Sequence, residues 1–315
     1  MRKVLVCFLF VFLILAFYKC NKILKKARES IAMQNDPVKE MNSLGLKRVS
    51  ESISKNIRNE IKLNSYKVNE KEIPLGETKI GGKPDVPDNF IWPKGNSGYL
   101  SFIAQINLEK ASKYDLEKVL PSKGFLYFFY DSKQEAWGFD PKDVGSWRVI
   151  FYEGNASELK RIDFPINLPE EDRFSACKVD MKSEKSYPAW DSIYIDELNL
   201  NEKEQEAYFD FYEGKIEDSF ANKILGHPDQ IQGDMQLECQ LVSNGLYCGD
   251  ASGYNDPRRK ELEKGVKEWR LLLQIDSEED AGMMWGDSGR IYFWIKADDL
   301  ANKRFDKVWM ILQCF

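Results

Sequence analysis

The heptapeptide KIGGKPD at residues 79–85 is repeated as KILGHPD at residues 223–229, and this repetition indicates a duplicated fold. In both copies a glycine permits unusual backbone angles, a proline fixes φ, and an aspartate can accept hydrogen bonds from nearby amides. The only histidine of the chain, His227, stands where the first copy has Lys83. We therefore predict that His227 belongs to a structural loop and that its replacement by alanine is nearly silent.

Two further sequence matches follow in the same order in both halves of the chain. They are AQIN (104–107) with LQID (273–276), and GFLYFFY (124–130) with GRIYFWI (289–295). Three matches in one order indicate two diverged copies of a supersecondary unit, over about residues 79–155 and 223–315. Two copies are too few for a solenoid, so we expect a pseudo-twofold pair that shares one sheet or core.

Short runs rich in β-branched and aromatic residues predict strands, because turn signals bound each of them. Examples are SFIAQINL, GFLYFFYD and SWRVIFYEG. Helical patterns intervene at residues 109–119, 202–213 and 258–268. The alternation predicts an α+β fold with a mixed or antiparallel sheet, in which residues 71–315 form one globular body.

The N-terminal segment has a different character. Residues 4–18 are fifteen consecutive apolar or aromatic residues, and residues 1–28 contain seven Lys or Arg and no acid. No small-x-small cleavage site follows, which favours an uncleaved membrane anchor with a single span. Residues 29–70 are predicted to be a charged helical segment, because isoleucines recur at four-residue intervals: Ile53, Ile57 and Ile61.

The basic residues around the predicted span bear on its orientation. Two precede it and five follow it before residue 29. The positive-inside rule therefore favours a membrane protein whose body faces the cytoplasm. The alternative is export through a cleaved signal peptide, since a charged start and a short apolar core also fit that signal.

The charge of the body restricts its partners. The chain has a net charge of −6, and residues 1–28 carry seven positive charges, so the remaining residues carry −13. Nucleic-acid binding depends on clustered Lys and Arg, and an acidic body argues against it. The charge fits a soluble domain or one that attracts a basic protein partner. The sequence leaves the oligomeric state open.

Metal, cofactor and nucleophile patterns are absent from the sequence. No C-x-x-C pair or His/Cys cluster suggests a metal site, and no motif predicts a cofactor. Cys239 and Cys248 flank a turn signal, which leaves both a disulfide and two buried thiols open. WGDSGR at residues 285–290 resembles a serine-protease loop, but it runs directly into a predicted strand and is better interpreted as a tight turn.

Several motifs together resemble one bacterial family. TKIGGKPDVPDNFIWP, LSFIAQINLE, LPSKGFLYFFYD, GHPDQIQGDMQLECQLVSNGLYCGD and MWGDSGRIYFWIKADDL are similar to the YwqG-like proteins of unknown function, over about residues 55–315. The resemblance implies no established activity and no catalytic residues. Members are discussed as components of toxin–immunity systems, and they typically lack an N-terminal anchor, which this chain is predicted to have.

Two function classes remain open. The first is a non-catalytic, membrane-tethered protein-binding module, of an immunity type or associated with the cell envelope. The alternative is a carboxylate-dependent hydrolase that acts on envelope carbohydrate. If a ligand groove exists, we expect it where repeated elements meet, at Gln105, Trp137, Gln274, Trp285 and Asp287. The competing interpretation is structural: the glutamines satisfy buried backbone and the tryptophans fill the core.

Overall fold

The computed structural model describes residues 36–216 and 222–315. These residues form two compact units. The first combines residues 36–56 with residues 196–216, and the second contains the rest. The predicted single body over residues 71–315 is therefore corrected, because residues 196–216 pack with the N-terminal segment instead.

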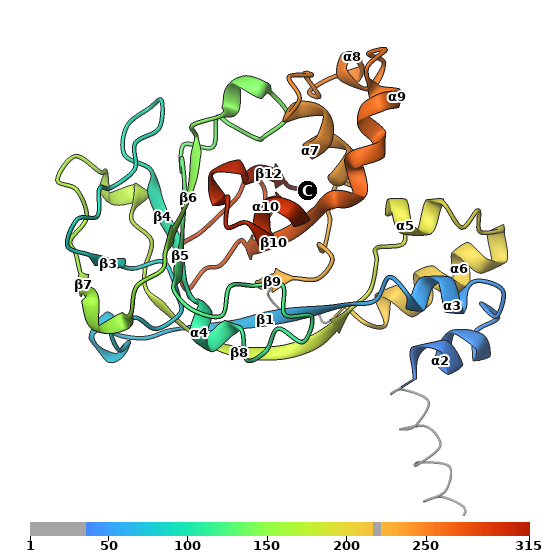
Figure 1. The fold of residues 1–315 in the computed structure, drawn as a ribbon, viewed down its shortest axis with the longest axis horizontal. Helices are drawn as coiled ribbons and strands as arrows, with labels where there is room; N and C mark the ends of the chain where they lie inside the picture. Colours follow the sequence, from blue (N-terminus) through green and yellow to red (C-terminus); the bar gives the residue numbers. More distant parts are fainter. Residues whose placement is uncertain (1–35, 217–221) are drawn as a thin grey trace, which may run out of the picture. The chain divides into compact units, whose positions relative to one another are not determined.

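The first unit is a small group of helices, α2 (Pro37–Ser43), α3 (Ser50–Ser54) and α6 (Glu202–Glu213), drawn in blue and yellow in Figure 1. Helix α6 begins with a capping box, in which Asn201 and Glu204 exchange hydrogen bonds between side chain and backbone. Arg48 binds both carboxylate oxygens of Glu204, at 2.9 Å from Nε and 2.6 Å from Nη2. This bidentate pair joins the two chain segments of the unit.

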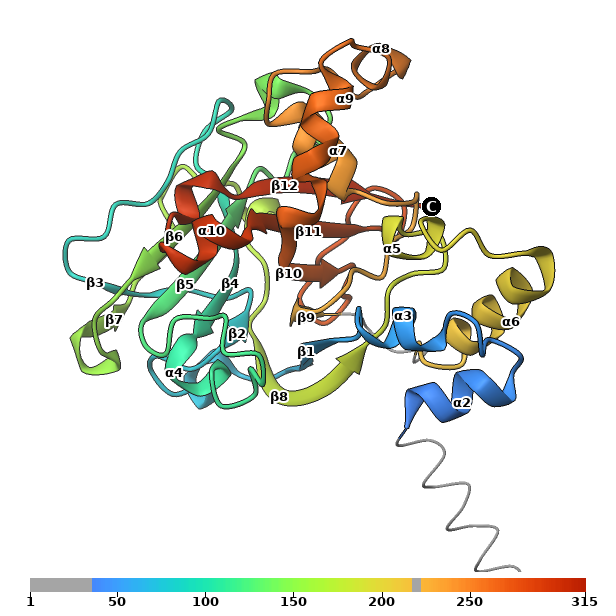
Figure 2. The same cartoon turned by 45° about the vertical axis from the view of Figure 1, so that its right-hand side comes forward.

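The second unit is built on a ten-stranded sheet in which every neighbouring pair is antiparallel (Figures 1 and 2). The strand order is β12-β11-β10-β9-β1-β8-β2-β4-β5-β6. Their bounds are β1 Arg58–Lys67, β2 Lys79–Ile80, β4 Ser101–Asn107, β5 Phe125–Tyr130, β6 Trp147–Tyr152, β8 Cys177–Ser186, β9 Lys223–Leu225, β10 Trp269–Asp276, β11 Arg290–Lys296 and β12 Trp309–Gln313. Of the two arrangements that the sequence left open, mixed or antiparallel, the sheet has the antiparallel one.

Equivalent motifs of the two halves occupy equivalent places in this sheet. Gln105 of β4 pairs with Tyr127 of β5, and Gln274 of β10 pairs with Tyr292 of β11. Each glutamine follows a register irregularity two residues earlier in its strand. The halves meet at the long β1–β8 pair, so the strand order reads the same way outward from its centre.

Short helices and a second, two-stranded sheet surround the large one. The small sheet pairs β3 (Asp85–Pro87) with β7 (Leu159–Arg161). The helices are α4 Leu108–Ala111, α5 Ile193–Asp196, α7 Gln236–Val242, α8 Ala251–Tyr254, α9 Arg259–Leu262 and α10 Ala297–Ala301. Alternate residues of β5 enter two different apolar clusters, with Phe128 in the main core and Phe129 in a smaller one. Both faces of this strand are therefore buried, which explains its unbroken aromatic run.

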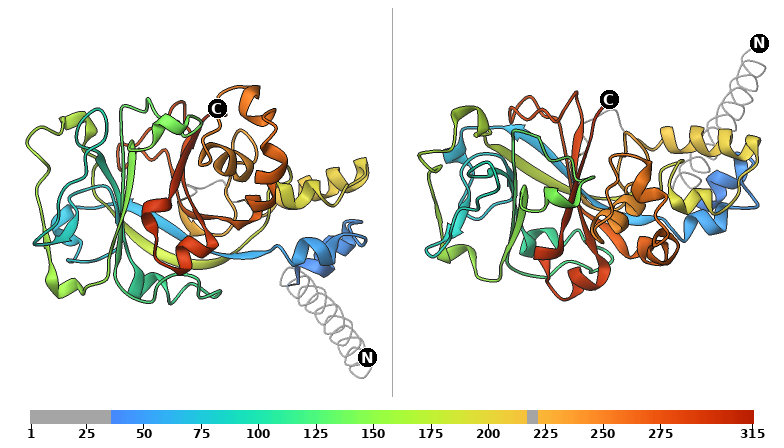
Figure 3. Two further views of the ribbon diagram at one scale, coloured as in Figure 1. Left: turned by 45° about the horizontal axis from the view of Figure 1, so that its top comes forward. Right: turned by 90° about the horizontal axis from the view of Figure 1, so that it is seen from above.

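The sheet curves until its two end strands, β6 and β12, come near each other (Figure 3). Trp147 of β6 and Trp309 of β12 meet edge to face with ring centroids 5.0 Å apart. The indole N–H of Trp147 also donates to the carbonyl of Val308 at 2.9 Å. Side chains, rather than a ladder of backbone hydrogen bonds, join these two edges in the described part of the chain.

The predicted helical segment at residues 29–70 is wrong over its C-terminal part. Ile57 precedes β1, and Ile61 lies inside that strand, paired with Ser183. Its sequence alternates Ile61 and Leu63 with polar residues, so the period of two prevailed over the four-residue spacing. Residues 29–35 lie outside the described residues.

The predicted anchor at residues 4–18 also lies outside the described residues. Helix α6, with 12 residues, is the longest of the helices described. Within residues 36–216 and 222–315, no helix has the length and apolar character needed to cross a membrane.

Candidate functional site

The first copy of the repeated heptapeptide closes a buried polar network, here called network 1. The ammonium of Lys79 lies 3.1 Å from a carboxylate oxygen of Asp85, and neither side chain is exposed. Gln105 accepts from the Asp85 amide at 2.7 Å and donates to its carboxylate at 3.2 Å. Tyr127 donates to the Asp85 carbonyl, and Arg161 binds the carboxylate at 2.7 Å. Network 1 thus places two cations on one carboxylate.

The second copy builds the same arrangement, network 2, with one different partner. Lys223 lies 2.8 Å from Asp229, and Gln274 accepts from the Asp229 amide at 2.9 Å while donating to its carboxylate at 2.8 Å. Tyr292 donates to the Asp229 carbonyl at 2.8 Å. Instead of a second cation, Glu60 lies 2.8 Å from Lys223. Network 2 thus places two carboxylates on one cation.

This difference moves the pKa of the two lysines in opposite directions. Burial lowers the pKa of Lys79 to about 8, since Asp85 offsets it only in part and Arg161 lowers it further. Burial would also lower the pKa of Lys223, but Asp229 and Glu60 together outweigh it and raise the pKa. The pKa of Asp85 is lowered, because Arg161 and Lys79 outweigh the effect of its burial.

The predicted site residues Gln105 and Gln274 therefore belong to separate networks rather than to one groove. Both are fully buried in the sheet, where their amides satisfy the backbone and carboxylate of the heptapeptide aspartate. Four strands separate β4 from β10 in the sheet order. Their contacts match the structural interpretation: each glutamine holds a loop in place.

The remaining predicted site residues occupy three different environments. Trp285 is fully buried, donates to the carbonyl of Asp276 at 3.1 Å and packs edge to face on Tyr130. Trp137 follows β5, whereas Trp285 precedes β11, so the two Trp-Gly pairs are not equivalent. The carbonyl of Trp137 accepts from the Leu312 amide at 3.0 Å. Asp287 is exposed in the turn before β11.

His227 lies in a loop, as predicted, but it is buried there. It is 3% exposed, its amide donates to the Ser186 hydroxyl at 2.8 Å, and its ring packs edge to face on Tyr194. Lys83, its counterpart, is partly exposed and pairs with Asp163. The two positions share a loop but not an environment, because Tyr194 covers only the second. A silent substitution is no longer expected.

The serine of WGDSGR lies in a tight turn, as the sequence indicated. Ser288 has a φ of +51°, and the amide of Gly289 donates to the Trp285 carbonyl at 2.7 Å. This turn leads directly into β11. Its left-handed backbone serves the chain reversal before the strand.

The cysteines that the structure describes are four buried free thiols. Burial raises the pKa of Cys177 and of Cys248 to about 12, and it raises that of Cys239 well above the usual value. Such thiols stay protonated at neutral pH and are poor nucleophiles. Among residues 36–216 and 222–315, no cluster of three or more His, Cys, Asp or Glu could hold a metal ion.

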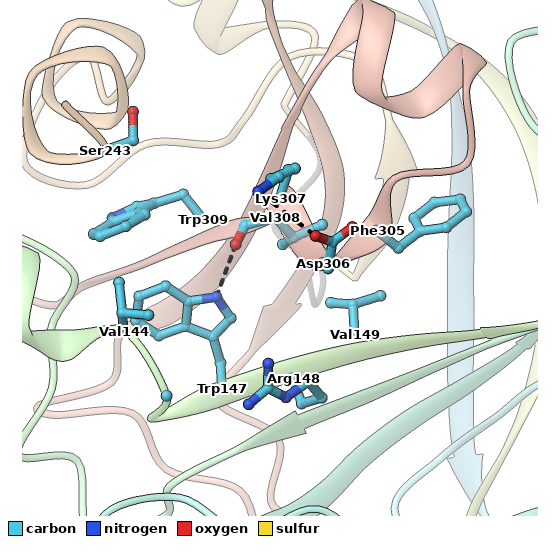
Figure 4. Close-up of a pocket in the computed structure, with 11 residues that line it drawn as sticks. Val144, Trp147, Arg148, Val149, Ser243, Phe305, Asp306, Lys307, Val308 and Trp309 are labelled. Carbon is cyan, nitrogen blue, oxygen red and sulfur yellow. Dashed lines mark hydrogen bonds and ion pairs between the residues drawn. The ribbon is translucent and has the colours of Figure 1, made fainter.

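A cleft of about 240 Å³ lies where the two end strands of the sheet approach each other (Figure 4). We call it the seam cleft, and it lies between β6 and the segment that leads into β12. Val144, Trp147 and Val149 line one side; Phe305, Lys307 and Trp309 line the other. Figure 4 shows the hydrogen bond from Trp147 to Val308 crossing it.

On the β6 side of the seam cleft, the outer edge of β6 pairs with no other strand among the described residues. The Asp131 amide donates to the Ser146 carbonyl at 2.8 Å, which sets the phase of the ladder between β5 and β6. Antiparallel ladders alternate, so the backbone groups of Trp147, Val149 and Phe151 point away from β5. Opposite them, the edge of β12 is already covered at Leu312 by the Trp137 carbonyl.

Sequence reasoning missed the seam cleft and found no signal for it. SWRVIFYEG predicts a strand, but a strand's place at the end of a sheet depends on the pairing of all ten strands. Trp147 and Trp309 lie 162 positions apart in the sequence, and no local pattern connects them.

Comparison with known proteins gives a family and no function. No curated protein matches the sequence. The narrower resemblance to the YwqG-like proteins stays a prediction, and it is consistent with a domain that has no assigned activity. The chain belongs to the DUF1963 family, a domain of unknown function whose pattern matches residues 78–314.

Proposed function

We propose that this protein is a non-catalytic binding protein that takes up an extended segment of a basic partner protein at the β6 edge. The observation that carries the proposal is the unpaired outer edge of β6, formed by the outward backbone groups of Trp147, Val149 and Phe151 beside the seam cleft. A strand edge offers unpaired donors and acceptors to an incoming peptide. The adjacent seam cleft, lined by apolar side chains together with Arg148, Asp306 and Lys307, would accommodate alternate side chains of that peptide.

The charge of the body supports a basic partner. Residues 29–315 carry a net charge of −13, so a cationic segment is attracted before it docks. Such attraction raises the association rate and weakens as salt is added, because exposed charges are screened over about 8 Å at physiological ionic strength. An immunity-type or envelope-associated role fits this mode of binding.

The membrane tether is a further part of the proposal. Residues 4–18 would hold the protein in the membrane, where the body meets its partner in a restricted volume. Removal of residues 1–28 is expected to move the body from the membrane fraction to the soluble fraction. A truncated chain that stays in the membrane fraction after salt washing would contradict a tether in this segment.

Calorimetry with two designed octapeptides tests the strand addition. One alternates Lys with Val and the other alternates Glu with Val, so both can extend but only the first is basic. We expect the Lys–Val peptide to bind at least ten-fold more tightly at low salt and to lose affinity as salt rises. Equal binding of the two peptides, or saturable binding of neither, would contradict the proposal.

Two substitutions of Val149 test whether the peptide binds at the β6 edge. Val149→Pro removes an outward N–H that does not pair with β5, and proline is tolerated at such edge positions. Val149→Thr keeps the N–H and a similar shape. We expect the proline variant to lose binding and the threonine variant to retain it, with folding of both checked by circular dichroism. Turnover of an envelope glycan that one carboxylate substitution abolishes would overturn the binding interpretation altogether.

A further inference from the structure

A second cavity of the large unit has a positively charged lining, although the body as a whole is acidic. It is a partly open cavity of about 420 Å³ between residues 118–121, α10 and β10. Three cationic residues, Lys118, Arg270 and Lys303, line it, and no acidic residue does. We call it the cationic cavity.

The rest of the lining is aliphatic. It consists of Val119, Leu120, Pro121, Ala297, Leu300 and Ala301. No aromatic ring is present on which a flat ligand could stack. Small and branched aliphatic side chains suit a flexible hydrocarbon chain, and the volume falls in the range of ordinary small-molecule sites.

The cations around the cavity are not fully neutralised by protein groups. Arg270 is 3.5 Å from one oxygen of Glu117, and Lys303 is 2.6 Å from Glu153. Both acids are partly exposed, so these pairs are weak. Among the described residues, none forms an ion pair with Lys118. Arg270 also lies near Arg58, whose pKa is lowered by its burial and by this like charge.

The backbone fixes the position of two of these cations. Lys118 has a φ of +56° and Lys303 a φ of +57°, in the left-handed region. Lys303 ends α10 in the usual way, because its amide donates to the Leu300 carbonyl at 3.0 Å and the Arg304 amide donates to the Asp299 carbonyl at 2.8 Å. The Lys118 amide donates to the Asp115 carbonyl at 3.3 Å, in a turn. Both lysines are therefore set at the cavity by local turns of the chain.

We propose that the cationic cavity binds an aliphatic carboxylate of small to medium chain length. The hydrocarbon chain would lie against the aliphatic lining, and the carboxylate would be held by Lys118 and Arg270, because charge-assisted hydrogen bonds to a carboxylate are strong in a partly desolvated site. This site is separate from the β6 edge and does not depend on the proposed peptide binding.

Calorimetry of the full chain in neutral phospholipid nanodiscs tests this proposal, with empty nanodiscs as the blank. The probes are hexanoate, its neutral analogue hexanamide, and acetate, which has the head group without the chain. We expect hexanoate to bind saturably and at least ten-fold more tightly than either of the others. Absence of saturable hexanoate binding, or equal affinity for hexanamide, would overturn the proposal.

Four variants assign the binding to the cavity. Lys118→Gln is expected to weaken hexanoate binding at least five-fold, whereas Lys113→Gln, an equal loss of charge on the same segment, should leave it unchanged. Ala301→Trp should fill the cavity and abolish binding. Val149→Pro should have no effect, which separates this site from the proposed function. Equal behaviour of the Lys118 and Lys113 variants would contradict the assignment.

Discussion

Network 1 and network 2 have the same geometry and opposite charge. Each contains a lysine, an aspartate, a glutamine and a tyrosine at matching positions of the sheet. Network 1 adds Arg161 to the aspartate, and network 2 adds Glu60 to the lysine. The framework of hydrogen bonds was kept while the third charged partner changed sign. A buried ion pair thus tolerates exchange of a neighbour as long as each charge keeps one opposite partner.

The largest effect is expected from Lys223→Met. This change removes the one cation that forms ion pairs with both Asp229 and Glu60, and breaking a buried pair typically costs about 3–5 kcal/mol. Urea unfolding measures the loss of free energy of unfolding. The matched variant Lys79→Met should cost much less, because Arg161 still neutralises Asp85. Equal losses of free energy of unfolding in the two variants would contradict the difference in charge between the networks.

The second-largest effect is expected at the aspartates, where substitution should cost more stability in network 1 than in network 2. Asp85→Asn leaves both cations of network 1 without a carboxylate, and we expect a loss of about 3 kcal/mol. Asp229→Asn should cost about half as much, since Lys223 keeps Glu60. Thermal unfolding of both variants at pH 7 checks this. A larger loss at Asp229 than at Asp85 would contradict the assignment of charges.

The third effect concerns the loops that the networks hold. His227→Ala removes a buried ring that packs on Tyr194, and we expect a loss of about 2 kcal/mol. Lys83→Ala, at the corresponding position, removes a partly exposed side chain and should stay within about 0.5 kcal/mol. Denaturant titrations of the two variants measure the contrast. A silent His227→Ala would show that the ring contributes no packing energy.

The stability cost of Lys79→Met should depend on pH, which provides a second test of the difference between the networks. At pH 7 we expect a cost of about 1–1.5 kcal/mol. The folded pKa of Lys79 is about 8 and the usual value is 10.5, so the unfolded chain binds more protons between these pH values and the contribution of Lys79 to stability rises with pH. The cost should therefore grow by about 1–2 kcal/mol from pH 7 to pH 10.

Network 2 supplies the control for that pH profile. The pKa of Lys223 is raised, so its contribution is complete below the usual lysine value and is lost only above it. The cost of Lys223→Met should be constant between pH 7 and pH 10. A parallel rise in both variants would mean that the two lysines titrate alike.

The smallest loss of stability is expected from removing the tyrosine hydroxyl groups, and it should be equal in the two networks. Tyr127 and Tyr292 each donate a hydroxyl to the carbonyl of the heptapeptide aspartate, at 2.7 and 2.8 Å. Tyr127→Phe and Tyr292→Phe should each cost about 1 kcal/mol, the usual value of one buried hydrogen bond. Chemical denaturation of both variants tests the shared framework. A difference above about 1 kcal/mol would show that the two tyrosines are not equivalent.

Local patterns predicted the parts of the structure that depend on neighbouring residues. The repeated motifs correspond to β2 and β9, β4 and β10, and β5 and β11, because apolar periodicity and turn residues act over a few positions. Helix α6 coincides with the predicted pattern at residues 202–213, since its cap and its apolar spacing are both local. The failure at β1 came from isoleucines whose spacing fits a helix and a strand equally.

Composition and short-range order in the sequence were enough to predict the repeated framework, a mixed or antiparallel sheet and the acidic charge of the body. Three features depended instead on the folded chain: the third charge in each network, the packing of Tyr194 on His227, and the places of β6 and β12 at the two ends of the sheet. These features arise from contacts between residues far apart in the chain. The free energy of these contacts depends on which surfaces the folded sheet brings together, and a local sequence pattern cannot predict that.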